Sequence, residues 1–146
     1  MSGAHELLGA SLGPTAWHEI TQERIDAFAE ATGDHQWIHV DPVRAAAGPF
    51  GTTIAHGYLT LSLCATLLGD VLHVEGYALT VNYGVNRVRF PAPVPVGSRL
   101  RGRFTVVSVE EVGGGDQAVI EATVEREGTE KPVCVAELVL RFLRAA

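Results

Sequence analysis

The sequence has little of what several classes of protein depend on. Among its 146 residues are two cysteines and one methionine, and only 19% are charged. Cys64 and Cys134 lie in apolar surroundings and are too few for a disulfide framework or a four-cysteine zinc site, so we expect them to be reduced core residues. The 11 basic residues face 17 acidic ones, giving a net charge of -6 without a basic block. A nucleic-acid partner is therefore not expected.

Long hydrophobic runs are also lacking. The most apolar stretch, residues 58–68, is interrupted by hydroxyl side chains and is shorter than the roughly 20 residues of a membrane span. Residues 1–13 contain no Lys or Arg and no apolar core of a signal peptide. We expect neither a membrane partner nor secretion, and therefore a cytoplasmic protein.

What the sequence does have is enough apolar residues for one core. The length and an apolar fraction of 47% predict a single domain over residues 1–146, with residues 1–13 as a loose N-terminal arm.

Three helices are predicted in the first half of the chain. Thr21 can cap a helix that ends at Gly33, because apolar residues recur between them at the spacing of one helix face. Asp41-Pro42 has the chemistry of an N-cap and a first helical position, and it begins a short helix that stops at Gly48. From His56 or Gly57 to about Gly69 the residues are apolar nearly all round, so we expect this third helix to be buried.

After Gly76 the apolar period changes from 3.6 to 2, which indicates strands. The first begins at residue 77 and shifts its apolar parity at Gly84, where we expect a bulge. Three more strands are predicted over residues 98–109, 117–126 and 133–143. The last strand has apolar residues at both odd and even positions, which predicts that both of its faces are buried. Helices first and long strands later favour an α+β fold, with an antiparallel sheet wrapped around the buried helix.

The densest polar cluster, residues 33–42, lies between two predicted helices and is expected to be a loop. Asp34 and His39 are five residues apart, so a loop can bring both side chains onto one water, and a carboxylate with an imidazole suffices for acid–base catalysis. Two alternatives stay open. Asp34 can simply cap a turn while His39 is a buried, hydrogen-bonded histidine, or His35 and His39 can hold a metal together with neighbouring acidic groups and His56.

Gly57 stands in the first turn of the predicted buried helix. Free N–H groups at a helix start point at an anion or carbonyl, and a glycine leaves the approach open. Its N–H can therefore hold an oxygen on which charge develops, or the glycine can serve only close helix packing.

These segments resemble the hydratase motif of the MaoC-like, (R)-specific enoyl-CoA hydratases. The resemblance lies in Thr32-Gly33-Asp34, in His39-Val40-Asp41-Pro42, in Ile54-Ala55-His56-Gly57 and in residues 82–97, and it covers most of the chain from Ile20 to Leu143. It implies the hotdog fold, a curved antiparallel sheet around a long central helix. The sequence departs from the family at Gln36-Trp37, where Asn-Pro is frequent, and at Ala65, where some members have serine.

The resemblance implies a reaction and a site. Water would add reversibly to a trans-2-enoyl thioester of coenzyme A or a carrier protein, giving an (R)-3-hydroxyacyl thioester, without a cofactor or metal. Asp34 and His39 would be the catalytic pair, and Gly57 would polarise the thioester carbonyl, with His56 and Asn86 also at the substrate. The residues do not select the direction of the reaction or the acyl-chain length.

Two other functions use the same fold, namely an acyl-CoA thioesterase and a non-catalytic acyl-CoA-binding subunit. The first requires a carboxylate on the central helix, which residues 58–68 do not offer, and the second has no need of the Asp34-His39 pair. A homodimer joined edge to edge is expected, because a lone sheet leaves long strand edges open unless charged residues guard them. Five arginines lie on the polar faces of the predicted strands. They either bind the phosphates of the substrate or form a solvated face; they are Arg87, Arg89, Arg99, Arg101 and Arg103.

Overall fold

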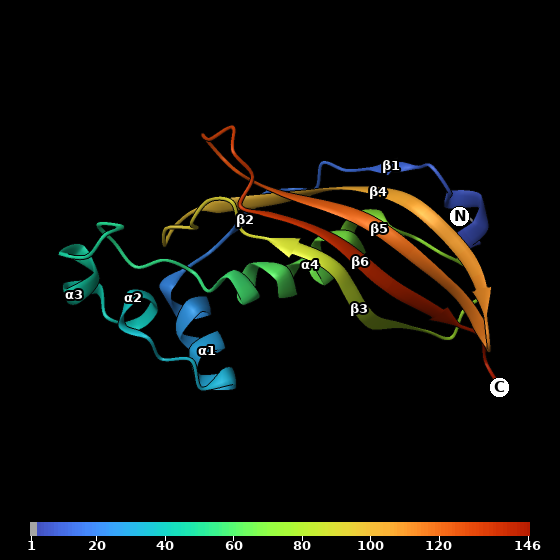
Figure 1. The fold of residues 1–146 in the computed structure, drawn as a ribbon, viewed down its shortest axis with the longest axis horizontal. Helices are drawn as coiled ribbons and strands as arrows, with labels where there is room; N and C mark the ends of the chain where they lie inside the picture. Colours follow the sequence, from blue (N-terminus) through green and yellow to red (C-terminus); the bar gives the residue numbers. More distant parts are fainter. Residues whose placement is uncertain (1–2) are drawn as a thin grey trace.

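An antiparallel sheet curves around one long helix (Figure 1). The computed structural model describes residues 3–146. The strands follow the order β1-β4-β5-β6-β3, and β2 also pairs with β4. Their bounds are β1 Ser11–Leu12, β2 His18–Glu19, β3 Leu79–Arg89, β4 Arg99–Val112, β5 Gly115–Arg126 and β6 Cys134–Leu143. The predicted α+β class is confirmed.

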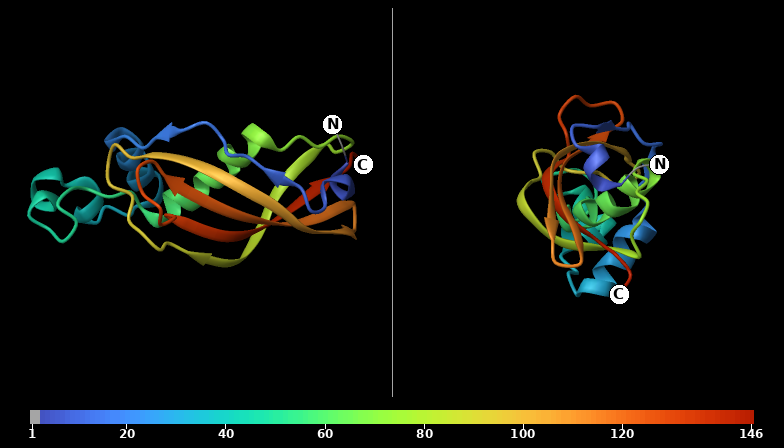
Figure 2. Two further views of the ribbon diagram at one scale, coloured as in Figure 1. Left: turned by 90° about the horizontal axis from the view of Figure 1, so that it is seen from above. Right: turned by 90° about the vertical axis from the view of Figure 1, so that its right-hand side faces the viewer.

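The long helix, α4 (Gly57–Val71), lies inside the curve of the sheet, as the end-on view in Figure 2 shows. One of its faces is buried in the core through Leu59, Thr60, Leu63, Cys64, Leu67 and Leu68. The expectation of burial all round is wrong for the opposite face, where Tyr58 is 70% exposed and Ser62, Ala65 and Thr66 are exposed as well. That face is short of large apolar side chains, and the sheet does not reach around to cover it.

The other α-helices gather at one end of the molecule, next to the start of α4 (Figures 1 and 2). Helix α1 (Gln22–Thr32) begins as predicted, with the Thr21 hydroxyl accepting a hydrogen bond from the N–H of Arg24, and it ends at Gly33, whose φ of +81° favours glycine. Asp41 caps α3 (Pro42–Ala46) in the same way. The intervening segment is not a plain loop, because residues 37–40 form the one-turn helix α2 (Trp37–Val40).

The long strands form as predicted. Residues 113–114 close a tight hairpin, since Val112 pairs with Gly115. The register of β3 against β6 shifts between Asn82 and Gly84, which confirms the bulge, and shifts again between Val85 and Arg87. The second shift is not visible in the apolar alternation.

The prediction of a loose N-terminal arm over residues 1–13 is wrong for residues 3–13. Residues 1–2 lie outside the described part of the chain. A short 3-10 helix (Ala4–Leu7) buries Ala4, and the N–H of Ala4 donates to the Tyr77 hydroxyl. Strand β1 then pairs with β4. The arm is held because its few apolar residues close one end of the core, a tertiary contact that its composition does not reveal.

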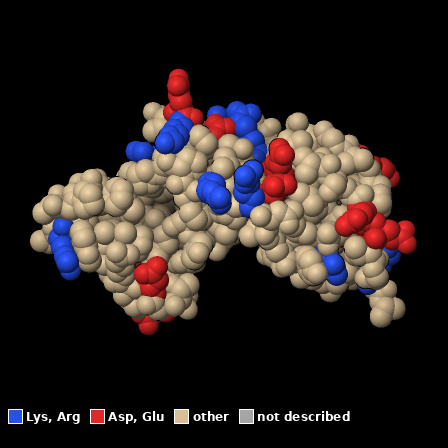
Figure 3. Space-filling model, in the orientation of Figure 1, with Lys and Arg blue, Asp and Glu red and all other residues tan. Residues whose placement is uncertain are grey.

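No helix within residues 3–146 is long and apolar enough to cross a membrane. On the face drawn in Figure 3, the basic side chains near the centre lie close to acidic ones, another stands apart at the left end, and together they form no unbroken basic surface.

Candidate active site

Three side chains from separate segments meet beside the start of α4. Asp34 follows α1, His39 belongs to α2, and His56 is the residue before α4. A carboxylate oxygen of Asp34 and one ring nitrogen from each histidine lie within 4.8 Å of one another. The predicted pair is therefore brought together, and His56 joins it.

His39 is oriented by a backbone carbonyl. Its Nδ1 lies 2.7 Å from the carbonyl oxygen of Ile54. A carbonyl only accepts, so we assign the proton to Nδ1, which leaves Nε2 with a free lone pair. Burial lowers the pKa of His39, partly opposed by the bond to Ile54, and the charge of His56 lowers it further while that of Asp34 raises it. His39 is thus a neutral imidazole at neutral pH, ready to accept a proton at Nε2.

His56 supports both members of the pair. Its ring stacks on that of His39, with centroids 3.8 Å apart and planes 23° from parallel. Its Nε2 lies 2.9 Å from the backbone oxygen of Asp34 and donates to it. The other ring nitrogen, Nδ1, is buried and is the one such side-chain atom without a hydrogen-bond partner among the residues described. His56 therefore fixes the backbone that carries Asp34 and leaves one polar atom free within the cluster.

Asp34 differs from the histidines in being exposed. One carboxylate oxygen lies 3.4 Å from the N–H of Gln36, a weak turn contact. The carboxylate therefore keeps most of its capacity to accept hydrogen bonds from a water or a substrate. Both interpretations of Asp34 and His39 are compatible with this geometry, because each has a local structural bond and still presents a free acceptor.

Hydrogen bonds from the Gln22 side chain hold α2 in place, a role that was not predicted from the sequence. The Gln22 side-chain amide donates to the backbone oxygen of His39 at 2.8 Å, and its carbonyl accepts from the Thr53 hydroxyl at 2.6 Å. Thr53 is 1% exposed. A glutamine in the first turn of a helix carries no sequence signal for this role, because the contact joins segments far apart in the chain.

Gly57 begins α4, and its N–H has no acceptor within residues 3–146. A Cβ built on Gly57 would lie 2.8 Å from Cδ2 of Phe90, so the ring of Phe90 packs on the glycine. Both suggested roles of Gly57 are therefore visible, namely a free N–H at a helix start and a close approach that only glycine allows. Phe90 was not singled out from the sequence.

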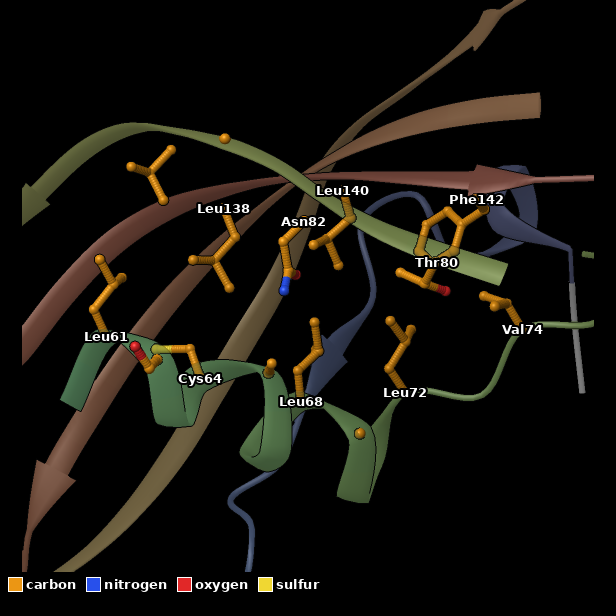
Figure 4. A pocket seen from close by; sticks show the side chains of 15 residues that line it. Leu61, Cys64, Leu68, Leu72, Val74, Thr80, Asn82, Leu138, Leu140 and Phe142 are labelled. Carbon is orange, nitrogen blue, oxygen red and sulfur yellow. The ribbon is translucent and has the colours of Figure 1, made fainter. Parts of the chain in front are cut away.

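Two cavities follow α4 away from this cluster. The first, of about 290 Å³, lies at the helix start, where Gly57 and Thr60 face Phe50, Phe90 and the segment 91–94. The second is an apolar groove of about 500 Å³ between α4, β3 and β6 (Figure 4). Leu61, Ala65, Leu68 and Leu72 line the groove and follow Gly57 at the spacing of a single helix face. The two cavities therefore lie along one stripe of α4, although they share no lining residue.

The stacked rings of His39 and His56 disfavour the metal-binding alternative. A metal lies in the plane of the imidazole that binds it, along the lone pair, and two nearly parallel rings at 3.8 Å direct their lone pairs side by side rather than at one point. His35, the other histidine of that alternative, is exposed and pairs with Glu30 at 3.7 Å, and Asp41 caps α3. The cluster fits a hydrogen-bonded water or substrate better than it fits a tetrahedral metal ion.

The remaining predicted residues lie apart from the cluster. Asn86 falls on the second irregularity of β3, is exposed, and lines neither of the two cavities. Arg99 pairs with Glu127 at 2.9 Å, and Arg101 and Arg103 both pair with Glu125. These three arginines thus belong to a solvated, paired face of the sheet.

Residues 4–129 match the family model described as MaoC like domain. The chain is 57% identical over 136 residues to 3-hydroxyacyl-thioester dehydratase Z of Mycobacterium tuberculosis, an alignment that covers 92% of this chain and 90% of the relative. It is 46% identical over 133 residues to nodulation protein N of Rhizobium leguminosarum bv. viciae, covering 88% and 82%.

Solved structures of similar shape include two (R)-hydratases. The R-hydratase PhaJ1 from Pseudomonas aeruginosa aligns with a TM-score of 0.75 and 25% identity, covering 94% of this chain and 83% of the other. The (R)-hydratase from A. caviae involved in PHA biosynthesis aligns with a TM-score of 0.76 and 25% identity, covering 92% and 96%.

Proposed function

The chain belongs to the MaoC-like family, and from that premise we propose how its site adds water to trans-2-enoyl thioesters and removes it from (R)-3-hydroxyacyl thioesters. It is a hydratase or dehydratase, a lyase of the hotdog fold, in keeping with its 57% identity to a 3-hydroxyacyl-thioester dehydratase and its likeness to two (R)-hydratases. The observation that carries the assignment of residues is the meeting of Asp34 and neutral His39 beside the free N–H of Gly57.

The substrate carbonyl sits at the start of α4 in this mechanism. The N–H of Gly57 and the positive end of the helix dipole polarise the thioester carbonyl, which makes Cβ electrophilic. The cavity of about 290 Å³ at Gly57 provides the space, and Phe90 packs at its wall.

Water is held between the Asp34 carboxylate and Nε2 of His39. As its oxygen bonds to Cβ, one of its protons passes to the pair, and the negative charge of the enolate rests on the Gly57 N–H. A proton from the pair is then delivered to Cα, so that one H and one OH have been added across the double bond. Every step is reversible, and the same groups dehydrate the 3-hydroxyacyl thioester. No step requires a cofactor.

The role of His56 in this proposal differs from the direct substrate contact implied by the resemblance. It is a positioning residue, because its ring stacks on His39, bonds to the Asp34 backbone and packs against Phe28. Asn86 remains a proposed substrate contact only if a second copy of the chain places it there, since it lies on the open edge of β3.

The acyl chain would follow the apolar groove. The groove starts one helical turn beyond Gly57 on the same stripe of α4, and five of its 15 lining residues are leucines, from α4, its C-cap and β6. Such a site binds acyl groups mainly through buried area, which contributes about 0.8 kcal/mol per methylene.

The thioesterase alternative finds no support in the site. Asp70 is the one acidic residue on α4, and it lies in the last turn, paired with His18 at 3.0 Å. A non-catalytic subunit would not need a neutral His39 with a free Nε2. Hydration is therefore tested directly by mixing the purified protein with crotonyl-CoA and following loss of the absorbance of the conjugated thioester. An active protein that instead releases free coenzyme A would favour the thioesterase.

A homodimer joined at β3 is part of the proposal. Strand β3 ends the sheet, and its large apolar residues are exposed in the single chain: Leu79, Val81, Tyr83 and Val85. The charged residues that could guard an open edge, Arg101, Arg103, Glu121 and Glu125, do not lie on β3. They belong to β4 and β5, of which β5 is interior and β4 is covered by β1 and β2. An apolar open edge pairs readily with another strand, and a second copy supplies one.

Sedimentation tests this assembly with a matched pair of variants. Val81 on β3 and Val107 on β4 are both 38% exposed. We expect the wild type and Val107→Lys to sediment at twice 15.6 kDa and Val81→Lys to shift toward 15.6 kDa. A wild type that is fully active at 15.6 kDa would contradict the dimer.

A further inference from the structure

Phe142 lies at the far end of the groove, beside Leu72, Val74 and Thr80 (Figure 4). Phe142 and Leu72 also line a narrow void behind the groove, which is too small to hold a water molecule. The other walls of that void are apolar and come from the 3-10 helix, β4 and β5, namely Ala4, Leu7, Val106, Ala118 and Ile120. Phe142 therefore stands between the groove and a closely packed part of the apolar core.

A buried polar network holds this ring in place. Asp116, which is completely buried, lies opposite Phe142 in the pairing of β5 with β6. Its carboxylate accepts hydrogen bonds from the Tyr77 hydroxyl at 2.6 Å and from Arg144 at 2.8 Å, and His5 lies 2.8 Å away. The hydrogen bond from Tyr77 lowers the pKa of Asp116, so the carboxylate stays charged and its partners stay ordered.

Tyr77 connects the network to the ring. Its aromatic face packs against Phe142, with centroids 5.4 Å apart, and its hydroxyl also accepts the N–H of Ala4. Through Tyr77, the network at Asp116 therefore packs against the ring of Phe142.

We propose that Phe142, held by Tyr77 and Asp116, is the end wall of the acyl site and sets the longest acyl chain that the protein accepts. The inference rests on the proposed function, because it takes the groove as the place of the acyl chain. From Gly57 to Leu72 the helix rises about 22 Å, at 1.5 Å per residue, so the wall stands at the depth of a long acyl chain. Each methylene buried before the wall raises kcat/KM about fourfold, and those beyond it have no space.

The test compares Phe142→Ala, and Phe142→Leu as a milder change that keeps the fold, with Phe104→Leu as a control. Phe104 is as buried as Phe142, at 2% exposure, but lines none of these cavities. kcat/KM is measured for 2-enoyl-CoAs from crotonyl-CoA to docosenoyl-CoA, a series that extends past the depth of the wall. Each variant's rates are divided by its own rate on crotonyl-CoA, and we expect the length limit to move upward by on the order of two methylenes only when Phe142 is made smaller.

The outcomes separate this inference from the proposed function. If every protein hydrates crotonyl-CoA but the length limit stays the same in the Phe142 variants, or moves as far in Phe104→Leu, the end wall is refuted and the hydratase stands. If the wild type hydrates no enoyl-CoA of any length, the proposed function itself fails.

Discussion

Replacing Gly57 by alanine should change both the packing at the start of α4 and the hydration activity, and the two effects can be measured separately. A Cβ at this position would stand 2.8, 2.9 and 3.0 Å from three ring carbons of Phe90, so the ring must move. Gly69, on the same helix, has nothing within 4 Å of such a Cβ. Alanine in a helix interior stabilises by about 1 kcal/mol relative to glycine, whereas overpacking costs about 1–3 kcal/mol. We therefore expect Gly69→Ala to raise the free energy of unfolding and Gly57→Ala to lower it.

Gly57→Ala should also lose hydration activity, in addition to the loss of stability. The displaced ring of Phe90 moves within the cavity at Gly57, where the thioester carbonyl must bind, although the N–H itself remains. We expect kcat/KM for crotonyl-CoA to drop at least about tenfold, equivalent to about 1.4 kcal/mol of transition-state binding. Urea unfolding and the hydration assay on both variants measure the two effects. A Gly57→Ala protein with unchanged stability and full activity would refute the close packing of Phe90 and the position of the carbonyl together.

Three further predictions follow from the site and the buried network. Because burial lowers the pKa of His39 and its neutral form is the base, kcat/KM should be lost on acidification with a midpoint below the ordinary value of 6.5; a midpoint above 6.5 would contradict the neutral base. Activity should persist after exhaustive chelation, and a loss restored only by added zinc would reverse the assignment. Asp116→Asn should lower the free energy of unfolding by about 2 kcal/mol at neutral pH, whereas Asp70→Asn, at an exposed pair, should change it by less than about 1 kcal/mol; equal effects in urea unfolding would oppose the buried network.

Local chemistry made much of the fold predictable. Thr21, Asp41 and Gly33 act at helix ends through bonds within a few residues, so the sequence alone indicates them. The alternation after Gly76 likewise follows from the pleat of a strand. The one-turn helix α2 was not predicted, because it is too short to show a period and is held by the distant contact from Gln22.

The candidate site was predictable in its chemical groups and not in its geometry. The spacing of Asp34 and His39 suggested that they meet, but the stack on His56 and the tautomer set by Ile54 depend on segments that only the fold brings together. Phe90 and the network around Asp116 were missed for the same reason. An isolated aspartate or phenylalanine looks alike in sequence whether it lies on the surface or closes a cavity.

The most direct test of the account compares kcat/KM for hydration of crotonyl-CoA in the wild type, Asp34→Asn, His39→Ala and the neighbouring control His35→Ala, with the chirality of the product determined. We expect (R)-3-hydroxybutyryl-CoA from the wild type and from His35→Ala, whose side chain is exposed. Asp34→Asn and His39→Ala should remain folded and lose about 10²-fold or more of the rate, the usual contribution of a positioned acid–base group. Full activity in both folded variants would contradict the assignment of the catalytic pair.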